Sequence, residues 1–502
     1  MNEENSFYKN TFLLTAANIT VGMLGFIFSI YLSKILGAEG VGLYNLVMPI
    51  YNLFIGLMTA GIIAAISKIA AVYSSRHDYS SLFKSLKSFA VFNFIWAIII
   101  GIMVFFAAPA IGMMWVKDSR TILAIKITCP AMICIALSNI LKGYFYGISK
   151  ITMPAIVDIF EKAMRIVVFL MIVVALSTDN LSTLVCAAYI ALTYGEFQSL
   201  FLLYLYFRYT KRKIQYVPSK TENSFQLVFD IIIVSLPLCL NAFLNNGFYT
   251  LSALVVPRRL VSAGFSYSSA LEMIGKYSGM AIVISNCPIV IINSLNTVLV
   301  PDLSQTMEQK DYFLAKSRIK EVLAISFLLG LATIIVCNTV PDSLGYMFFS
   351  KKDIGLYIRA ASIVSPISFS AMSMFGILNG LSRQKIILRN AIITETLEVT
   401  CLYFLTGIYR INVYGYAITA LIINSLSLFL NLHEVKKNVD LDISLCNIVI
   451  FILAAILIYF MIKLCLPFMS SFNPIVKNTI VMIAGYGAMA LFALRYQSRV
   501  NS

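Results

Sequence analysis

Charged residues are scarce in this chain. Asp, Glu, Lys and Arg make up 12% of its 502 residues, whereas hydrophobic residues make up 60%. A soluble globular protein carries about 25% charged residues. Long blocks of Ile, Leu, Phe, Ala and Val take their place, and no stretch between these blocks is long enough to form the core of a soluble domain. The composition therefore excludes a soluble enzyme and indicates an integral membrane protein.

Metal-binding and nucleotide-binding motifs are also missing. The nine Cys contain no CxxC pair, and the two His, His77 and His433, are far apart in the sequence, so the clustered ligands of a zinc site are absent. No GxxxxGK[ST] loop is present, which excludes a built-in ATPase of that type. We therefore expect no catalytic residue, no metal and no cofactor, and we interpret the Cys as small core residues.

An apolar block of about 20 residues can cross the hydrocarbon core of a membrane. Fourteen such blocks predict an all-α protein with fourteen transmembrane helices. They cover residues 11–33, 42–72, 89–116, 121–147, 152–176, 183–207, 226–256, 276–300, 321–340, 357–381, 386–408, 413–433, 446–468 and 475–494. We expect an N-lobe over 1–218 with helices 1–6, a C-lobe over 219–440 with helices 7–12, and an additional C-terminal helix pair over 441–502.

The basic residues indicate how the chain is oriented, because Lys and Arg favour the cytoplasmic side of a membrane. If the N-terminus is cytoplasmic, the loops and helix ends on that side hold 22 Lys and Arg, and those on the outer side hold 13. This bias predicts that both termini are cytoplasmic. It also accounts for the net charge of +15 without a nucleic-acid partner.

The two lobes show an internal repeat at an offset of 237 residues. At this offset ILKG at 140–143 aligns with ILNG at 377–380. The acids Asp158 and Glu161 align with Glu395 and Glu398. Six helices separate the copies, so both have the same orientation, and we expect them to be related by an axis along the membrane normal.

Several ionisable residues fall within the predicted spans. A charge near the bilayer centre costs at least about 2.5–3.5 kcal/mol, so it normally faces a cavity or a partner. These residues are Lys68, Asp158, Glu161, Lys162, Arg165, Glu196, Asp230, Glu395 and Glu398. Those of the helix over 152–176 form either a structural charge cluster, with partners three and four residues apart, or the lining of a cavity. The candidates for coupling to Na⁺ or H⁺ are Asp158, Glu161, Glu395 and Glu398.

A second group of basic residues lies toward the outer ends of the helices that open the lobes. Lys34 ends the first helix. Arg258 and Arg259 follow Pro257, at which we expect helix 7 to end because proline lacks an N–H. These cations either contact lipid headgroups or line a cationic cavity, since the planar guanidinium of Arg suits phosphate. The candidate substrate-binding residues are Arg258, Arg259, Lys34, Lys68 and Lys276.

Five segments of the chain resemble polysaccharide flippases of the multidrug/oligosaccharidyl-lipid/polysaccharide (MOP) exporter superfamily. They are SKILGAEGVGLY at 33–44, GIIAAISK at 61–68, VPRRL at 256–260, GKYSGMA at 275–281 and NTVLVP at 296–301. The last three are similar to the branch represented by stage V sporulation protein B. The matching segments are scattered over about residues 10–400, and the last hundred residues agree only in hydrophobic pattern.

The resemblance implies two six-helix lobes in a V around a central cavity. It implies a transporter and no enzyme, acting as a monomer in the cell membrane. The cargo would be an undecaprenyl-diphosphate-linked saccharide, such as the peptidoglycan precursor lipid II, moved by alternating access in spore cortex or cell wall synthesis. Coupled Na⁺ or H⁺, or the membrane potential, would drive it. Lipid II flippases line their cavity with arginines, whereas the first helix here carries only Lys34, at its outer end.

Two other classes of protein stay open at this point. A cation-coupled multidrug exporter of the same superfamily would have a more apolar and acidic cavity. A membrane glycosyltransferase or polymerase would expose acidic residues on a sizeable loop, and the loops predicted here are short.

Overall fold

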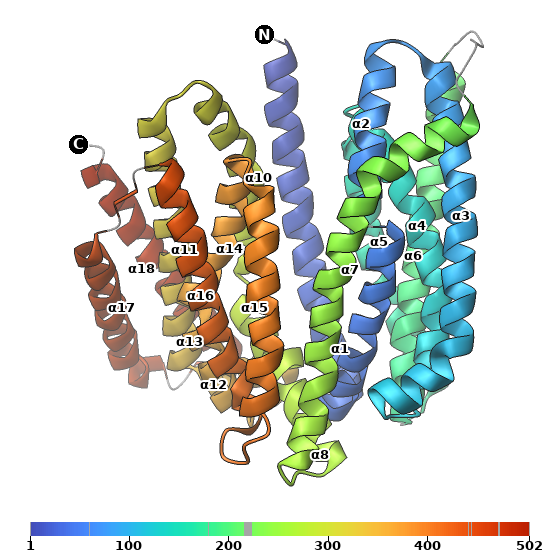
Figure 1. Ribbon diagram of the computed structural model, residues 1–502. Helices are drawn as coiled ribbons and strands as arrows, with labels where there is room; N and C mark the ends of the chain where they lie inside the picture. Colours follow the sequence, from blue (N-terminus) through green and yellow to red (C-terminus); the bar gives the residue numbers. More distant parts are fainter. Residues whose placement is uncertain are drawn as a thin grey trace. The chain divides into compact units, whose positions relative to one another are not determined.

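The described part of the chain is helical and contains no β-strand (Figure 1). The computed structural model describes residues 2–59, 61–178, 180–214, 223–439, 441–442, 444–469 and 472–500. The predicted domain limits at 218/219 and at 440 lie outside these residues, so the domain boundaries stay predictions.

The helices of the N-terminal half are α1 (Asn2–Thr59), α2 (Ile62–Ser75), α3 (Tyr79–Ala110), the π-helical turn η1 (Ile111–Val116), α4 (Thr121–Gly147), α5 (Thr152–Leu176), α6 (Leu181–Lys213) and α7 (Ser224–Ser262). Those of the C-terminal half are α8 (Tyr267–Ile274), the π-helical η2 (Gly275–Ala281), α9 (Ile282–Asn286), α10 (Ile289–Glu308), α11 (Tyr312–Thr339), α12 (Pro341–Phe349), α13 (Gly355–Ile363), α14 (Ser365–Gly380), α15 (Gln384–Leu405), η3 (Asn412–Tyr414), α16 (Gly415–Asn438), α17 (Leu445–Cys465), η4 (Pro467–Met469) and α18 (Pro474–Val500).

The chain divides into two compact units that are not contiguous in sequence. Unit 1 comprises Met1–Leu36 and Leu43–Leu254, and unit 2 comprises Gly37–Gly42 and Val255–Ser502. Unit 1 therefore contains α2–α6 with most of α1 and α7. Unit 2 contains α8–α18, the end of α7 and a short segment from the middle of α1.

That short segment belongs to unit 2 because glycines permit a very close approach. Gly37 has φ 66° and ψ −175°, a left-handed conformation that interrupts the helix and that glycine adopts without strain. A Cβ at Gly42 would lie 2.3 Å from the carbonyl oxygen of Leu271, and one at Gly275 would lie 1.8 Å from the carbonyl oxygen of Ala38. The segment therefore packs backbone to backbone against α8 and η2.

Three predicted spans are broken helices. The span predicted over 42–72 is interrupted at Gly61, whose φ is 77° and whose Cβ would lie 2.5 Å from that of Leu238. The span predicted over 276–300 is wrong as one helix, because α8–α9 meet α10 at a bend of 54° beside Pro288. The span over 357–381 bends by 48° between α13 and α14, where proline again lies in the first turn of the second helix.

Helix α7 continues beyond Pro257 to Ser262, so the prediction that it ends at this proline is wrong. The missing N–H removes one backbone hydrogen bond, but the turns that follow are closed. Ser262 Oγ donates to the carbonyl oxygen of Arg258 at 2.9 Å, and the amide of Ala263 donates to that of Arg259 at 2.9 Å. The chain turns only at Gly264, where φ is 107°.

By length and composition, nine helices of the described part can cross a membrane, or up to eleven if each of two bent pairs counts as one span. One of the nine, Thr15–Ser75, has 61 residues. This is about 90 Å of helix, which is enough for two crossings. Neither α5 nor α15 is among them, because each carries charges along its apolar length. The count of fourteen stays a prediction.

The helix ends indicate a repeat register that differs from the predicted one. Gly147 ends α4 and Gly380 ends α14. The serine two residues later has a positive φ in both units, 59° at Ser149 and 57° at Ser382. These matching positions are 233 residues apart in the sequence. The offset of 237, which paired Gly143 with Gly380, is therefore wrong by one helical turn.

The corrected register changes which charges correspond in the two units. Lys162 and Arg165 of α5 now align with Glu395 and Glu398 of α15. The repeat thus relates basic residues in one unit to acidic residues in the other.

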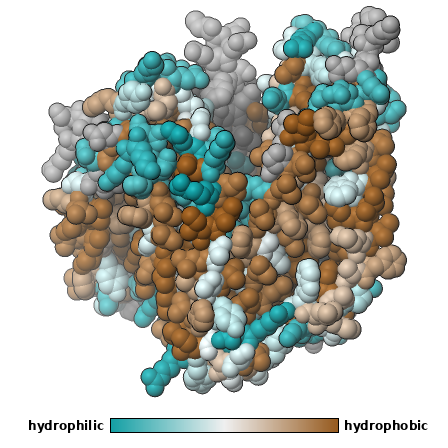
Figure 2. Space-filling view, viewed as in Figure 1, coloured by the Kyte–Doolittle hydropathy of each residue, from teal (hydrophilic) through white to brown (hydrophobic). Residues whose placement is uncertain are grey.

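Large hydrophobic side chains remain exposed along many helices. Phe106, Val174 and Leu464, for example, are 78%, 76% and 73% exposed. Hydrophobic residues cover the middle of each unit, while hydrophilic residues gather toward the helix ends (Figure 2). Soluble proteins rarely expose apolar patches of this extent, whereas lipid chains solvate them.

Candidate functional site

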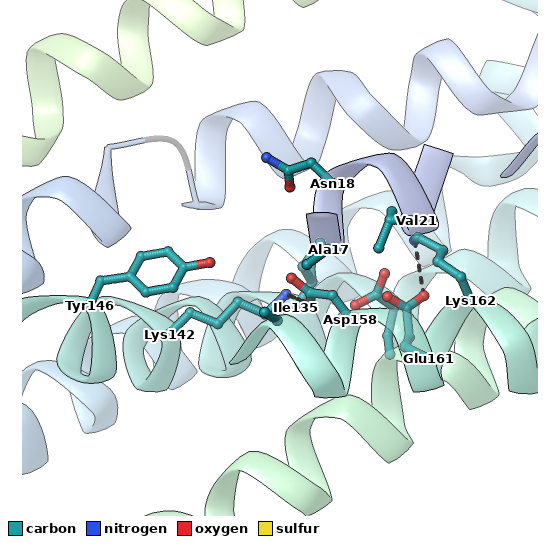
Figure 3. Close-up of a pocket in the computed structure, with 11 residues that line it drawn as sticks. Ala17, Asn18, Val21, Ile135, Lys142, Tyr146, Asp158, Glu161 and Lys162 are labelled. Carbon is teal, nitrogen blue, oxygen red and sulfur yellow. Dashed lines mark hydrogen bonds and ion pairs between the residues drawn. The ribbon is translucent and has the colours of Figure 1, made fainter. Parts of the chain in front are cut away.

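Six charged side chains of unit 1 lie together on α4, α5 and α6 and form what we call the α5 network. Figure 3 labels four of them, Lys142, Asp158, Glu161 and Lys162. They are Lys142 on α4, Asp158, Glu161, Lys162 and Arg165 on α5, and Glu196 on α6. Residues three, four and seven apart share one face of a helix, so α5 presents all four of its charges in one direction. The sequence spacing on α5 thus builds the network.

Each carboxylate of the network has a basic partner. Lys142 Nζ lies 2.6 Å from Asp158 Oδ1. Glu161 Oε1 accepts hydrogen bonds from Lys162 Nζ at 3.0 Å and from Arg165 Nη2 at 2.8 Å. The same Arg165 nitrogen lies 3.6 Å from Glu196 Oε1. Three cations therefore balance three anions, and the network is neutral as a whole.

The centre of the network is shielded from the surface. The side chains of Glu161, Glu196 and Arg165 are 4%, 8% and 11% exposed. Gly195 allows α6 to approach this closely, since a Cβ there would lie 3.3 Å from Cγ and Oε1 of Glu161. Pairing and hydrogen bonding are what make such burial of charge tolerable.

A cavity of about 210 Å³ opens beside the network. Its wall is made by Ala17, Asn18 and Val21 of α1, Ile135, Lys142 and Tyr146 of α4, Ala155, Asp158, Glu161 and Lys162 of α5, and Glu196 of α6 (Figure 3). At about 30 Å³ per molecule it has room for about seven waters. Within the described residues, Arg165 Nε, Tyr51 Oη and Ser199 Oγ are buried polar atoms of this unit without a protein partner. Such atoms are ordinarily satisfied by ordered water.

The two interpretations of the α5 charges are therefore both realised in the structure. The charges form ion pairs, and they also line a cavity. Sequence reasoning counted Lys142 among the basic residues of the cytoplasmic loops and helix ends, and it overlooked Asn18 and Tyr146. Lys142 lies near the end of α4, shortly before the acidic residues of α5, and this closeness in sequence could have predicted its ion pair with Asp158. The packing of α1 against the cavity has no corresponding signal in the sequence.

The acids of unit 2 differ from those of unit 1. Glu395 and Glu398 are partly buried on α15, and neither forms an ion pair within the part of the chain that the structure describes. Glu395 Oε2 is buried without a hydrogen-bond partner there. Among the described residues, these two carboxylates therefore have no basic partner, unlike those of the α5 network.

Arg259 is engaged within unit 2. Its Nε donates to the carbonyl oxygen of Tyr403 at 2.9 Å, and its guanidinium lies 4.2 Å from the centre of that ring. A Cβ at Gly407 would lie 2.4 Å from Arg259 Nη2. Since α15 ends at Leu405, the arginine serves as a cationic cap on carbonyls that the helix leaves unpaired.

Lys276 is also engaged within unit 2. Its Nζ lies 2.7 Å from Oε1 of Glu272, the partner that a spacing of four residues on one helix favours. It also lies 2.5 Å from Asp353 Oδ2, which sequence reasoning missed. Asp353 lies in the loop between α12 and α13. Partial burial raises the pKa of Asp353, but the hydrogen bond and charge of Lys276 lower it further, so that the pKa lies below its ordinary value.

The remaining basic candidates are exposed. Lys34 and Lys68 lie in unit 1, and Arg258 lies in unit 2. The shared cationic cavity predicted for them stays a prediction.

These apolar helices, with their internal breaks and buried charges, define a multi-pass α-helical membrane protein of the kind that transporters exemplify. The chain belongs to the polysaccharide biosynthesis protein family, whose sequence pattern matches residues 7–307. The family resemblance noted in the sequence is thereby confirmed.

Two proteins of Bacillus subtilis (strain 168) are similar to this chain over most of its length. Stage V sporulation protein B is 25% identical over 444 residues, which are 88% of this chain and 85% of that protein. Lipid II flippase MurJ is 21% identical over 407 residues, which are 75% of this chain and 73% of that protein.

Solved structures share the fold. An inward closed conformation of lipid II flippase MurJ superposes with a TM-score of 0.72 at 12% identity, over 98% of this chain and 100% of that one. An inward-facing MATE family transporter of the MOP superfamily gives a TM-score of 0.64 at 15% identity, over 84% of this chain and 98% of that one. The expected all-α membrane transporter fold is confirmed.

Proposed function

We propose that this protein is a flippase that moves an undecaprenyl-diphosphate-linked saccharide, a peptidoglycan precursor such as lipid II, across the cell membrane. The observation that carries the proposal is the similarity over most of the chain to stage V sporulation protein B and to a lipid II flippase. The fold of alternating-access transporters supports it. The proposed occasion is spore cortex or cell wall synthesis, and the proposed functional state is a monomer without enzymatic activity.

The chemistry of the cargo sets what the protein must supply. A lipid diphosphate needs cations in a hydrated path, while its polyprenyl chain stays in the lipid. Arg258, Lys34 and Lys68 are exposed and suit this role. Arg259 and Lys276 hold other groups of unit 2 in the present state, so they would serve only after leaving Tyr403 and Asp353.

The driving force follows from the charge of the cargo. An inside-negative potential favours outward movement of negative charge by about 2.3 kcal/mol per charge for each 100 mV. With both termini in the cytoplasm, as the charge bias predicts, flipping is outward and the potential assists it. Coupling to Na⁺ or H⁺ would use Glu395 and Glu398, which lack a resident cation, ahead of Asp158 and Glu161, which have one.

A cation-coupled multidrug exporter is the second candidate function. The observation that favours it is the likeness in fold to MATE family transporters together with the unpaired acids of α15. The two functions differ in cargo, so one assay separates them.

The test is transport in proteoliposomes that contain either fluorescent lipid-linked saccharides of defined sugar or cationic dyes. We expect flipping of the undecaprenyl-diphosphate-linked cargo, faster under a potential that drives negative charge outward, and no dye transport. Folded protein that moves dyes and none of the lipid-linked saccharides would overturn the proposal in favour of the exporter.

Two double variants test which residues bind phosphate and which couple transport to an ion gradient. Arg258→Gln with Arg259→Gln should lower flipping if these arginines meet phosphate. Unchanged flipping by the folded variant would limit them to headgroup and helix contacts. Glu395→Gln with Glu398→Gln should remove any dependence on a Na⁺ or H⁺ gradient. The exposed Asp230→Asn, whose partner is Gln226 on the same helix, is the matched control.

A further inference from the structure

One end of unit 1 gathers the ends of several helices around aromatic rings. The ring centres of Phe83 and Tyr144 are 6.3 Å apart. The ring centre of Phe207 lies 6.0 Å from that of Phe83 and 5.2 Å from that of Tyr144. These contacts place the start of α3 and the ends of α4 and α6 side by side. Aromatic residues at helix ends are typical of the boundary between lipid chains and headgroups.

Basic residues lie at these helix ends and on the connections beside them. We call them the basic end of unit 1, and they are Arg76, Lys150, Arg208, Lys211, Arg212 and Lys213. Lys211 Nζ lies 4.8 Å from the centre of the Phe83 ring, and Lys213 Nζ lies 4.3 Å from that of Tyr209. The ammonium groups of these two lysines thus lie over aromatic rings in cation–π contacts.

Three acids of unit 1 have partners other than these six cations. Asp78 accepts a hydrogen bond from the amide of Ser81 at 3.0 Å as the cap of α3. Asp230 accepts from Gln226 Nε2 at 3.0 Å. Asp158 lies deeper and pairs with Lys142. Within the described residues, none of the six cations of the basic end forms an ion pair with an acid.

Unit 2 provides the contrast. At the end where α10 and α16 finish and α11 begins, Lys316 pairs with Asp442 at 2.9 Å. Arg318 pairs with Asp302 at 3.3 Å, and Lys437 lies 3.6 Å from a carboxylate oxygen of Glu434. Within the described residues, acids of unit 2 therefore pair with some of the basic residues at this end, whereas the six cations of the basic end of unit 1 have no such pairs.

We propose that the basic end of unit 1 is a binding surface for the headgroups of anionic phospholipids. Phosphate oxygens complement both the ammonium groups and the guanidinium forks. These cations lie on the end of α6 and on the two connections that follow α2 and α4. Three separate segments suit several lipid headgroups better than a single substrate molecule. The inference does not depend on the proposed transport function, because its readout is lipid binding.

The experiment measures binding of phosphatidylglycerol, phosphatidylcholine and undecaprenyl diphosphate to the purified full-length protein in detergent. The test variant is Arg208→Gln, Arg212→Gln and Lys213→Gln together, all exposed residues. The matched control removes the same charge from unit 2 through Lys316→Gln, Arg318→Gln and Lys437→Gln. Each Lys or Arg near an anionic lipid surface strengthens binding about fivefold, so we expect about a hundredfold weaker phosphatidylglycerol binding by the test variant.

The control should stay within about threefold of the wild type, and phosphatidylcholine should bind all three proteins alike. The charge-retaining Arg208→Lys with Arg212→Lys should bind normally, which separates lost charge from lost folding. If the test variant and the control variant lose phosphatidylglycerol affinity equally, the effect depends on net charge alone, and the proposal is overturned. Undiminished phosphatidylglycerol binding would also overturn it, and weakening for undecaprenyl diphosphate alone would make this end a substrate-capture surface instead.

Discussion

At the scale of residues, Arg165 holds the α5 network together because it contacts both Glu161 and Glu196. Arg165→Met would leave these buried carboxylates with Lys162 as their nearest cation. Breaking a buried pair from one side costs about 3–5 kcal/mol. We therefore expect the free energy of unfolding to fall by about that amount, measured as a lower midpoint of thermal unfolding in detergent.

The double variant Arg165→Met with Glu161→Gln is the control, because it also removes one of the stranded charges. It should recover part of the lost midpoint. Lys162→Gln should have a smaller effect, since the Lys162 side chain is 28% exposed. An unchanged midpoint for Arg165→Met would mean that the glutamates do not need this cation.

Asp353 provides a prediction about pH. Its pKa is lowered by Lys276, so its contribution to stability is present above its ordinary pKa of about 3.9 and is lost as the pH falls through the lowered value. The side chain is 53% exposed, which limits the contribution to about 1 kcal/mol or less. Asp353→Asn should lower the unfolding midpoint slightly at pH 7, and the difference should shrink as the pH falls below the ordinary pKa. A difference that stays constant as the pH falls would contradict the assignment.

The sequence predicted those contacts of the site in which the two partners are close together in the sequence. The four charges of α5 and the pair of Lys276 with Glu272 follow from spacing along one helix. Arg259 was assigned to a cavity, whereas it caps α15 through Tyr403, which is far away in the sequence. Contacts between distant helices depend on packing, and a single sequence does not encode them in a readable pattern.

At the scale of elements, Gly275 sets the approach of η2 to the segment 37–42. A Cβ there would lie 1.8 Å from the carbonyl oxygen of Ala38, and backbone cannot move aside as a side chain can. We expect Gly275→Ala to lower the free energy of unfolding by at least about 1–3 kcal/mol, by the overpacking that it causes. The midpoint of thermal unfolding in detergent measures this.

Gly487→Ala is the matched control. No atom lies within 4 Å of a Cβ at this position of α18. Alanine in a helix interior is more stable than glycine by about 0.5–1 kcal/mol, so the control should unfold slightly later than the wild type. Similar shifts for both variants would show that the contact with Ala38 is not close.

Elements were predictable where one apolar block makes one helix, as in α3, α4 and α6. The breaks at Gly61 and Pro288 lie inside continuous apolar blocks, so hydropathy alone joins the pieces. Pro257 caused the opposite error, because it predicted a helix end where α7 continues. A helix tolerates one missing hydrogen bond when the backbone hydrogen bonds of the following turns are formed. The predicted repeat register was likewise wrong by one helical turn. It was based on similar residues at 140–143 and 377–380, whereas the ends of α4 and α14 indicate a different alignment.

At the scale of the whole molecule, the charge bias predicts the topology. In a background without cysteine, Ser177→Cys should react with a membrane-impermeant maleimide on intact cells. Ser149→Cys and Ser382→Cys should react only after permeabilisation. All three serines are exposed ends of helices, so accessibility to the reagent differs only by the side of the membrane. Labelling of Ser382→Cys on intact cells would reject the topology with both termini inside.

The membrane class and the transporter fold followed from composition and from short motifs, because lipid imposes long apolar helices on any sequence that crosses it. The two compact units did not follow. Their limits lie at a glycine-rich turn within α1 and inside the continuous helix α7, and no polar linker marks either place.

The interrupted α1 also has a consequence for biosynthesis. Residues 37–42 leave the ribosome before any part of 255–502, the remainder of the unit to which they belong. At about 5–20 residues per second, this segment waits on the order of ten to fifty seconds for α8 and η2 to be made. All of unit 1 has been synthesised once Leu254 is added, whereas unit 2 combines a piece of the first helix with residues that are made last. Completion of the fold is therefore a late event, in which a segment near the N-terminus packs against helices from the middle of the chain.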